Sequence, residues 1–119
     1  MSFLLVDDEP QLRQALARSL SARGHTVQQA ANHREAVAAA LSGTYDLLFL
    51  DINLPDATGW DVLRDIHAAG KHIPTVVFSA VTPSVRRIRE FGPIGVLTKP
   101  FPIESLLRYV TTVQEAKRA

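Results

Sequence analysis

The fold is decided by the stretch Asp46-Leu-Leu-Phe-Leu-Asp51, which continues directly into Ile52-Asn53-Leu54-Pro55-Asp56. Leu47 to Leu50 are apolar without interruption, a pattern typical of a strand that is buried on both faces of a parallel sheet. A carboxylate at the end of such a strand costs free energy unless it has a partner. Three other short apolar runs also end in polar or charged residues. We therefore expect the four ends to meet at one site.

Composition and charge exclude several classes of protein. The chain has 119 residues, of which 46% are hydrophobic, so we expect one globular domain over residues 1–119 with a frayed tail over residues 113–119. A net charge of +1 argues against a general nucleic-acid or membrane-surface binder. The lack of cysteine excludes disulfides, thiolate metal sites and cysteine nucleophiles. No stretch approaches the ~18 apolar residues of a membrane span, and we expect a cytoplasmic protein.

Five predicted strands alternate with five predicted helices along the chain. The strands are Phe3–Val6, Thr26–Ala30, Leu47–Leu50, Thr75–Phe78 and Gly95–Thr98. The first helix has an apolar stripe of Leu12, Ala15, Leu16 and Leu20, and Gly24 is expected to end it in a left-handed cap. Short strands that alternate with helices predict an α/β fold with a parallel sheet covered on both faces. Right-handed crossovers make that sheet doubly wound.

Two helix starts carry capping signals. Asn32 and Glu35 have the spacing of a capping box, and Thr58 is expected to cap the helix that follows Asp51. Trp60, next to that cap, is interpreted as a residue of helix packing. The chain's four histidines share no ligand spacing, so we assign them no metal.

The polar strand ends predict a metal site with a lysine beside it. Ligands of open parallel sheets bind beyond the carboxyl ends of the strands, and there this chain places Asp7, Asp8, Asp51, Ser79 and Lys99. Three carboxylates pressed together stay ionised only with a cation among them. Hard oxygen ligands without cysteine favour Mg²⁺ over zinc.

A carboxylate beside a hard metal and a lysine has few chemical roles. It can act as a nucleophile on a phosphoryl group and form an aspartyl phosphate. The metal and the Lys99 ammonium would then neutralise charge on the transferring oxygens, and Ser79 would donate a hydrogen bond to one of them. These residues therefore predict phosphoryl transfer to Asp51.

The same residues, in the same order, carry a resemblance to a known family. The chain has Val6-Asp7-Asp8, then Asp51 followed by Leu54-Pro55-Asp56-Ala57-Thr58-Gly59, then Ser79-Ala80 and Lys99-Pro100-Phe101. This order resembles the receiver domain of two-component response regulators, and the resemblance covers essentially the whole chain. It implies a flavodoxin-like (βα)₅ sandwich with a five-stranded parallel sheet in the order 2-1-3-4-5. It also implies a cis peptide bond between Lys99 and Pro100.

The resemblance further implies roles and partners for the site residues. Asp51 would accept the phosphoryl group from a cognate histidine kinase or phosphotransfer protein. Mg²⁺ would be held by the side chains of Asp8 and Asp51 and the backbone carbonyl of Asn53, with Asp7 nearby, often through water. Ser79 and Lys99 would bind the phosphoryl oxygens. We expect a signalling switch that changes conformation near the fourth helix and fifth strand. It would not be an enzyme.

One departure from the family leaves an alternative open. Val96 stands three residues before Lys99, where the family usually has Tyr or Phe. That aromatic residue relays the switch, so the chain could instead be a degenerate receiver that binds proteins independently of phosphorylation. A haloacid-dehalogenase-type phosphatase is disfavoured because Asn53 stands where its general acid would be. The output partner and oligomeric state stay open, a dimer included, and direct nucleic-acid or membrane binding is not expected.

Overall fold

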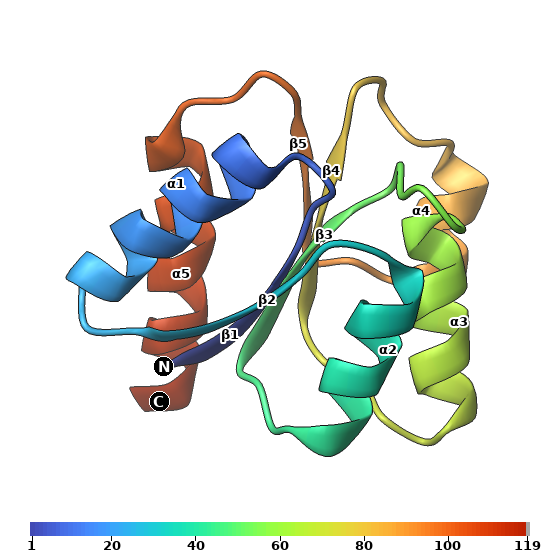
Figure 1. Cartoon of the computed structure of the whole chain (residues 1–119), viewed down its shortest axis with the longest axis horizontal. Coiled ribbons are helices and arrows are strands. Elements are labelled where there is room, and N and C mark those ends of the chain that lie inside the picture. The colour runs from blue at the N-terminus through green and yellow to red at the C-terminus, as the bar shows by residue number, and fades with distance from the viewer. Residues whose placement is uncertain (119) are drawn as a thin grey trace.

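The computed structural model describes residues 1–118 and shows a parallel sheet between two layers of helices (Figure 1). The strands are β1 (Ser2–Val6), β2 (Thr26–Ala30), β3 (Leu47–Asp51), β4 (Thr75–Ser79) and β5 (Gly95–Thr98). The helices are α1 (Pro10–Ala22), α2 (His33–Ser42), α3 (Gly59–Ala68), α4 (Val85–Phe91) and α5 (Ile103–Arg118). The sheet has the order β2-β1-β3-β4-β5 with parallel pairings throughout. The predicted fold, strand order and cis Lys99–Pro100 bond are confirmed.

The sheet separates two apolar cores because successive strand residues point to opposite faces. Helices α1 and α5 cover one face, and α2, α3 and α4 lie on the other (Figure 1). In β1, Phe3 and Leu5 enter the core beneath α1 and α5, whereas Leu4 and Val6 enter the core beneath α2 and α3. Every residue of β3 and β4 is buried. The uninterrupted apolar run from Leu47 to Leu50 is thereby explained.

Helix faces follow the predicted periodicity with two differences. In α1, Leu16 and Leu20 are buried, but Ala17 is buried in place of Ala15, because Ala17 shares the face of Leu20 at a spacing of three residues. In α2, the helical spacing of Ala36, Val37 and Ala40 would place Leu41 on the same buried face, but Leu41 is 46% exposed.

The helix caps form where the sequence predicts them. The Asn32 side chain accepts a hydrogen bond from the backbone N–H of Glu35 at 2.8 Å. The Glu35 side chain accepts from the N–H of Ala31, one residue before the cap itself. At α3, Thr58 and Asp61 form a reciprocal capping box. Gly24, just beyond α1, has the positive φ of a left-handed cap.

Both ends of the described chain lie at the same end of the molecule, away from the carboxyl ends of the strands (Figure 1). The Asp46 carboxylate connects them, because it accepts a hydrogen bond from the N–H of Ser2 at 2.8 Å and pairs with Lys117 of α5. Helix α5 continues to Arg118, and the frayed tail expected over residues 113–119 stays a prediction. Val113 packs against the core beneath α1 and α5; residue 119 lies outside the described residues. Among residues 1–118, no helix is long and apolar enough to cross a membrane.

Candidate functional site

The carboxyl ends of β1, β3, β4 and β5 bring the predicted site residues to one edge of the sheet. The strand register pairs Val6 with Leu50 and Ser79 with Thr98. Asp7 and Lys99 therefore follow directly after paired positions. The backbone N–H of Lys99 also donates to the carbonyl of Ser79 at 2.8 Å, which continues the ladder past the end of β5. The backbone thus fixes the relative positions of these side chains before any metal binds.

The Lys99 ammonium lies at the centre of the site. Its Nζ atom is 2.9 Å from Asp51 Oδ2, 2.9 Å from Asp7 Oδ2 and 3.0 Å from Glu9 Oε1. Burial by itself lowers the pKa of Lys99, but the close contacts with the carboxylates of Asp7, Asp51 and Glu9 outweigh that effect and raise the pKa well above its usual range. Lys99 is therefore a permanent positive charge at neutral pH.

Asp7 is fully buried and only partly satisfied. Its Oδ1 atom accepts a hydrogen bond from the N–H of Glu9 at 2.9 Å. Its Oδ2 atom is close to the Lys99 ammonium, yet it accepts no hydrogen bond of acceptable direction from any described residue. Burial raises the pKa of Asp7 against the opposing effects of Glu9 N–H and Lys99, and the charge of Asp51 raises it further. A buried, under-coordinated carboxylate oxygen is a suitable ligand for a hard cation.

The acceptor candidate, Asp51, is held at both carboxylate oxygens. Oδ1 accepts a hydrogen bond from the N–H of Asn53 at 2.9 Å, and Oδ2 accepts one from Lys99. Asp51 is 3% exposed. Ser79 is 6% exposed, at the end of the neighbouring strand, and its Oγ accepts a hydrogen bond from the N–H of Val81 at 3.3 Å. That leaves the Ser79 hydroxyl proton free to be donated to a ligand.

The residues at this edge fit a magnesium ion. Carboxylate oxygens of Asp7, Asp8, Glu9 and Asp51 lie within 4.8 Å of one another, and all are hard oxygen donors. The buried Asp7 Oδ2 atom accepts no hydrogen bond and is paired only with the Lys99 ammonium, so it has capacity left to ligate a cation. The metal-ligand roles of Asp7, Asp8, Asp51 and Asn53 stay predictions.

Glu9 is the site residue that the sequence analysis missed. It begins α1 at the N-cap position, where an acid has an ordinary structural explanation. Its side chain nevertheless reaches Lys99, 90 residues further along the chain. The available signal was the unbroken acidic run Asp7-Asp8-Glu9 directly after a buried strand.

The loop after Asp51 is held close to the strand end by Gly59. The N–H of Gly59 donates to the Ile52 carbonyl at 2.8 Å. A Cβ added to Gly59 would lie 2.6 Å from the carbonyl oxygen of Asp51. Only glycine therefore permits this approach, because real Cβ atoms do not come so near a backbone oxygen.

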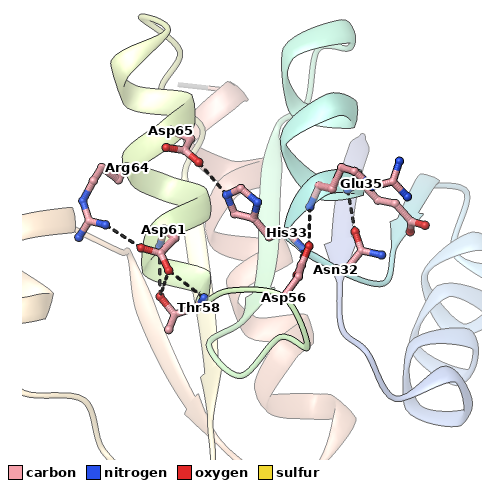
Figure 2. Close-up of polar contacts among 9 residues, drawn as sticks. Asn32, His33, Glu35, Asp56, Thr58, Asp61, Arg64 and Asp65 are labelled. Atoms are coloured by element: carbon pink, nitrogen blue, oxygen red, sulfur yellow. Dashed lines mark hydrogen bonds and ion pairs between the residues drawn. The ribbon is translucent and has the colours of Figure 1, made fainter.

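The tip of the same loop is hydrogen-bonded to the start of α2 (Figure 2). The Asp56 carboxylate accepts hydrogen bonds from the N–H groups of His33 and Arg34, at 2.8 and 3.2 Å, and so caps the first turn of α2. The His33 ring contacts Asp65 of α3 at 2.7 Å. The segment that follows the acceptor is thus bound to α2, and α2 is bound in turn to α3.

Helix α4 is attached mainly by one aromatic stack. It has no buried residue, but Phe91 at its end stacks on Trp60 of α3 with the ring centroids 5.3 Å apart. The interpretation of Trp60 as a packing residue is confirmed, since it is 6% exposed and lies in the core. Val96 is half-buried against the same core.

Comparison with known proteins gives consistent relatives. Residues 3–111 match the response regulator receiver domain family. The chain is 36% identical over 115 residues to the transcriptional regulatory protein CusR of Escherichia coli, covering 95% of this chain and 51% of CusR. It is 37% identical over 105 residues to TcrA of Mycobacterium tuberculosis, covering 87% of this chain and 42% of TcrA. The chain thus spans about half the length of these relatives.

Solved structures agree with these sequence matches. A two-component response regulator from Clostridium difficile has a TM-score of 0.90 and 26% identity, covering 100% of this chain and 99% of that chain. TrrA of Thermotoga maritima, solved in complex with Mg²⁺ and BeF, has a TM-score of 0.82 and 28% identity, covering 94% and 97% of the two chains. The chemotaxis protein CheY4 of Vibrio cholerae has a TM-score of 0.85 and 30% identity, again covering 94% and 97%.

Proposed function

The chain belongs to the response regulator receiver domain family, and from that premise we propose that it is a signalling switch in which Asp51 accepts a phosphoryl group. The observation that carries the proposal is the Asp51 carboxylate, buried at a strand end and hydrogen-bonded to a permanently charged lysine at 2.9 Å. The donor would be a phosphohistidine on a cognate histidine kinase or phosphotransfer protein. As a domain that is itself modified, it is a switch rather than an enzyme.

The chain's own residues account for each requirement of the transfer. The N–H of Asn53 and the Lys99 ammonium fix the two oxygens of Asp51, so the nucleophile is oriented before the donor arrives. The Lys99 ammonium is placed to pair with a phosphoryl oxygen, and its raised pKa keeps the proton on Nζ throughout. Ser79, on the adjacent strand, would donate its hydroxyl proton to another phosphoryl oxygen.

Magnesium would be held by the side chains of Asp7, Asp8 and Asp51, with the backbone carbonyl of Asn53 completing the protein's share. When bound, the ion supplies positive charge that offsets repulsion between the phosphoryl oxygens and the carboxylates. The structure of TrrA with Mg²⁺ and BeF supports this assignment by similarity. The buried Asp7 Oδ2 atom supports it from within this chain.

Phosphorylation would change the electrostatics of the site and bias the region of α4. The modified Asp51 carries roughly −1.5 to −2 charge, and it would draw Lys99 and Ser79 toward new positions. Helix α4 follows the β4 strand end and has no buried residue, so little packing opposes its movement.

A degenerate receiver that acts as a binding module is the second candidate. The observation that favours it is Val96, which supplies no aromatic ring at β5 to follow a movement of Ser79. In this case the site would be structurally intact but its occupation would leave α4 unchanged. The location proposed in either case is the cytoplasm, where histidine-kinase donors act.

The test combines phosphorylation and a conformational readout. The protein is incubated with Mg²⁺ and acetyl phosphate or phosphoramidate, and the intact mass is recorded. We expect one phosphoryl adduct on wild type and on the control Asp46→Asn, which lies at the opposite end of the sheet, and none on Asp51→Asn. No adduct with either donor would contradict the proposal.

Beryllofluoride with Mg²⁺ separates the two candidates. Trp60 is the chain's single tryptophan and stacks on α4, so its fluorescence reports movement of that helix. A switch changes Trp60 emission when beryllofluoride binds, and the change is absent in Asp51→Asn. Binding of beryllofluoride, detected by ¹⁹F NMR, with no change at α4 would instead identify the degenerate module.

A further inference from the structure

We propose that Glu9 is a specificity-determining residue of the acceptor site, where its carboxylate disfavours phosphodonors with excess negative charge. The inference rests on the proposed function, because it concerns the choice of donor for Asp51. It starts from an observation that the phosphorylation chemistry does not require: Glu9 Oε1 lies 3.0 Å from the Nζ atom of the lysine that must receive the phosphoryl oxygens.

Glu9 differs from the other carboxylates around Lys99 in its exposure. Asp7 and Asp51 have side chains that are 0% and 5% exposed, whereas the Glu9 side chain is 61% exposed. The two buried acids are fixed by backbone hydrogen bonds from Glu9 and Asn53. Glu9 is therefore the outermost of the three, and an incoming donor meets its charge before it meets theirs.

The position of Glu9 beside a cavity reinforces this point. A cavity of about 490 Å³ adjoins the site and is lined by Glu9, Leu12, Ala80, Lys99, Pro100 and Phe101. Glu9 and Lys99 supply the charged groups of this lining, and the other four residues are apolar. A donor that approaches through the cavity therefore interacts with one negative charge, on Glu9, and one positive charge, on Lys99.

Charge counting shows why this single carboxylate matters. The ionised carboxylates of Asp7, Asp8, Glu9 and Asp51 carry a total charge of −4. The Lys99 ammonium contributes +1, so the net charge of the site is −3. A bound divalent cation would bring the total to −1. The charge of Glu9 therefore decides whether the loaded site is anionic or neutral toward a donor.

The two transfer reactions differ in donor charge but deliver the same phosphoryl group. In each, an Asp51 oxygen forms a bond to phosphorus while the bond from phosphorus to the leaving group breaks and the leaving group keeps the electron pair. Acetyl phosphate is a dianion that releases acetate. Phosphoramidate at neutral pH is largely a monoanion with a protonated nitrogen, and it releases ammonia without needing a further proton. A nitrogen-bound phosphoryl group on a protein resembles the second donor.

The experiment compares the rates of phosphorylation of wild type, Glu9→Gln and Glu104→Gln with the two donors at pH 7. Glu104 is an exposed residue in the first turn of α5. Its replacement by glutamine changes the net charge by the same amount as Glu9→Gln, but at a site away from Lys99. The Mg²⁺ dissociation constant of each protein is first measured from Trp60 fluorescence, and the rates are then taken at saturating Mg²⁺. This removes any effect of Glu9 on metal affinity from the comparison.

We expect Glu9→Gln to accelerate the reaction with acetyl phosphate about three- to tenfold more than the reaction with phosphoramidate. That range corresponds to one unit of donor charge a few ångströms from a carboxylate near the protein surface. The difference should shrink when ionic strength rises from about 0.1 M to about 1 M, because the screening length falls from about 10 Å to about 3 Å. Glu104→Gln should keep the wild-type ratio of the two rates.

Two results would overturn the inference while leaving the proposed function intact. The first is that Glu9→Gln accelerates the reactions with both donors equally. This would mean that the substitution frees Lys99 from its ion pair with Glu9 but does not change the preference for donor charge. The second is no change in either rate. If wild type gains a phosphoryl group from neither donor, the proposed function itself fails, and the two failures are thereby distinguished.

Discussion

Replacing Lys99 by methionine removes the only ammonium that contacts the buried carboxylates among the described residues. The methionine keeps most of the apolar stem, so the packing of the side chain changes little. What changes is the partner of Asp7 and Asp51, whose side chains are 0% and 5% exposed. Both acids would then share a buried site without a compensating charge.

The expected cost is about 3–5 kcal/mol of unfolding free energy at pH 7 without Mg²⁺, the range for removing one partner of a buried ion pair. The contact with Glu9 adds little to that figure, because Glu9 is 61% exposed and exposed pairs contribute ~0–1 kcal/mol. Burial raises the pKa of Asp7, so the cost should fall at acid pH, where protonation of Asp7 removes one of the buried charges. In wild type the pKa of Lys99 is raised, so its contribution is fully present below the unfolded-state pKa of ~10.4 and is lost only as pH rises beyond it.

The assay is urea denaturation followed by circular dichroism and Trp60 fluorescence, at pH 7 and pH 4, with and without Mg²⁺. Because a ligand stabilises the state that binds it, Mg²⁺ should stabilise Lys99→Met more than wild type, which already has one cation in the site. Lys117→Met is the matched control. It breaks a pair whose lysine is 55% exposed, and we expect a loss of only ~0–1 kcal/mol.

Two outcomes would refute this reasoning. One is wild-type stability of Lys99→Met at pH 7 in the absence of Mg²⁺. The other is a destabilisation that is the same at both pH values and with or without Mg²⁺, which would identify lost packing rather than unpaired carboxylates as the cause.

Three further substitutions test the loop that follows Asp51, each in the same denaturation assay. Gly59→Ala brings a Cβ to 2.6 Å from the Asp51 carbonyl oxygen and should cost about 1–3 kcal/mol; unchanged stability would contradict the close approach. Asp56→Ala removes the cap of α2 and should cost about 1 kcal/mol, with faster amide exchange in the first turn of that helix, whereas unaltered exchange would mean that the cap is dispensable. Hydrogen bonds from the backbone N–H and hydroxyl of Thr58 lower the pKa of Asp61, so its stabilisation is present above the unfolded-state pKa of ~3.9 and is lost as pH falls through the lower folded-state value. The difference in stability between wild type and Asp61→Asn should therefore be largest near neutral pH and shrink below about pH 4, and a difference independent of pH would count against this origin.

Features with a short-range cause could be predicted from the sequence. The run from Leu47 to Leu50 defines a buried central strand, because no half-exposed strand tolerates four apolar residues in succession. The caps at Asn32 and Thr58 form with partners only three residues away. The strand ends then bring Asp51 and Lys99 to one edge through topology alone.

Features that depend on distant side chains could not be predicted in the same way. The contact of Glu9 with Lys99 spans 90 residues, and the cap that Asp56 gives to α2 spans 23. The presence of Glu9 or Asp56 in the sequence does not imply such a distant partner, because acidic residues are common at helix starts and in turns for local reasons.

The Asp46 bridge has a consequence for tethering. Because Asp46 holds Ser2 and Lys117 together, the two ends of the domain leave from one spot, and a short linker would join them without disturbing the fold. That spot lies at the amino edge of the sheet (Figure 1), whereas Asp51 ends β3 at the carboxyl edge. A fluorescent protein or surface anchor attached through either end would therefore leave the acceptor face open to a docking kinase. A protein attached there would respond to phosphorylation of Asp51 only through a conformational change that is transmitted across the domain.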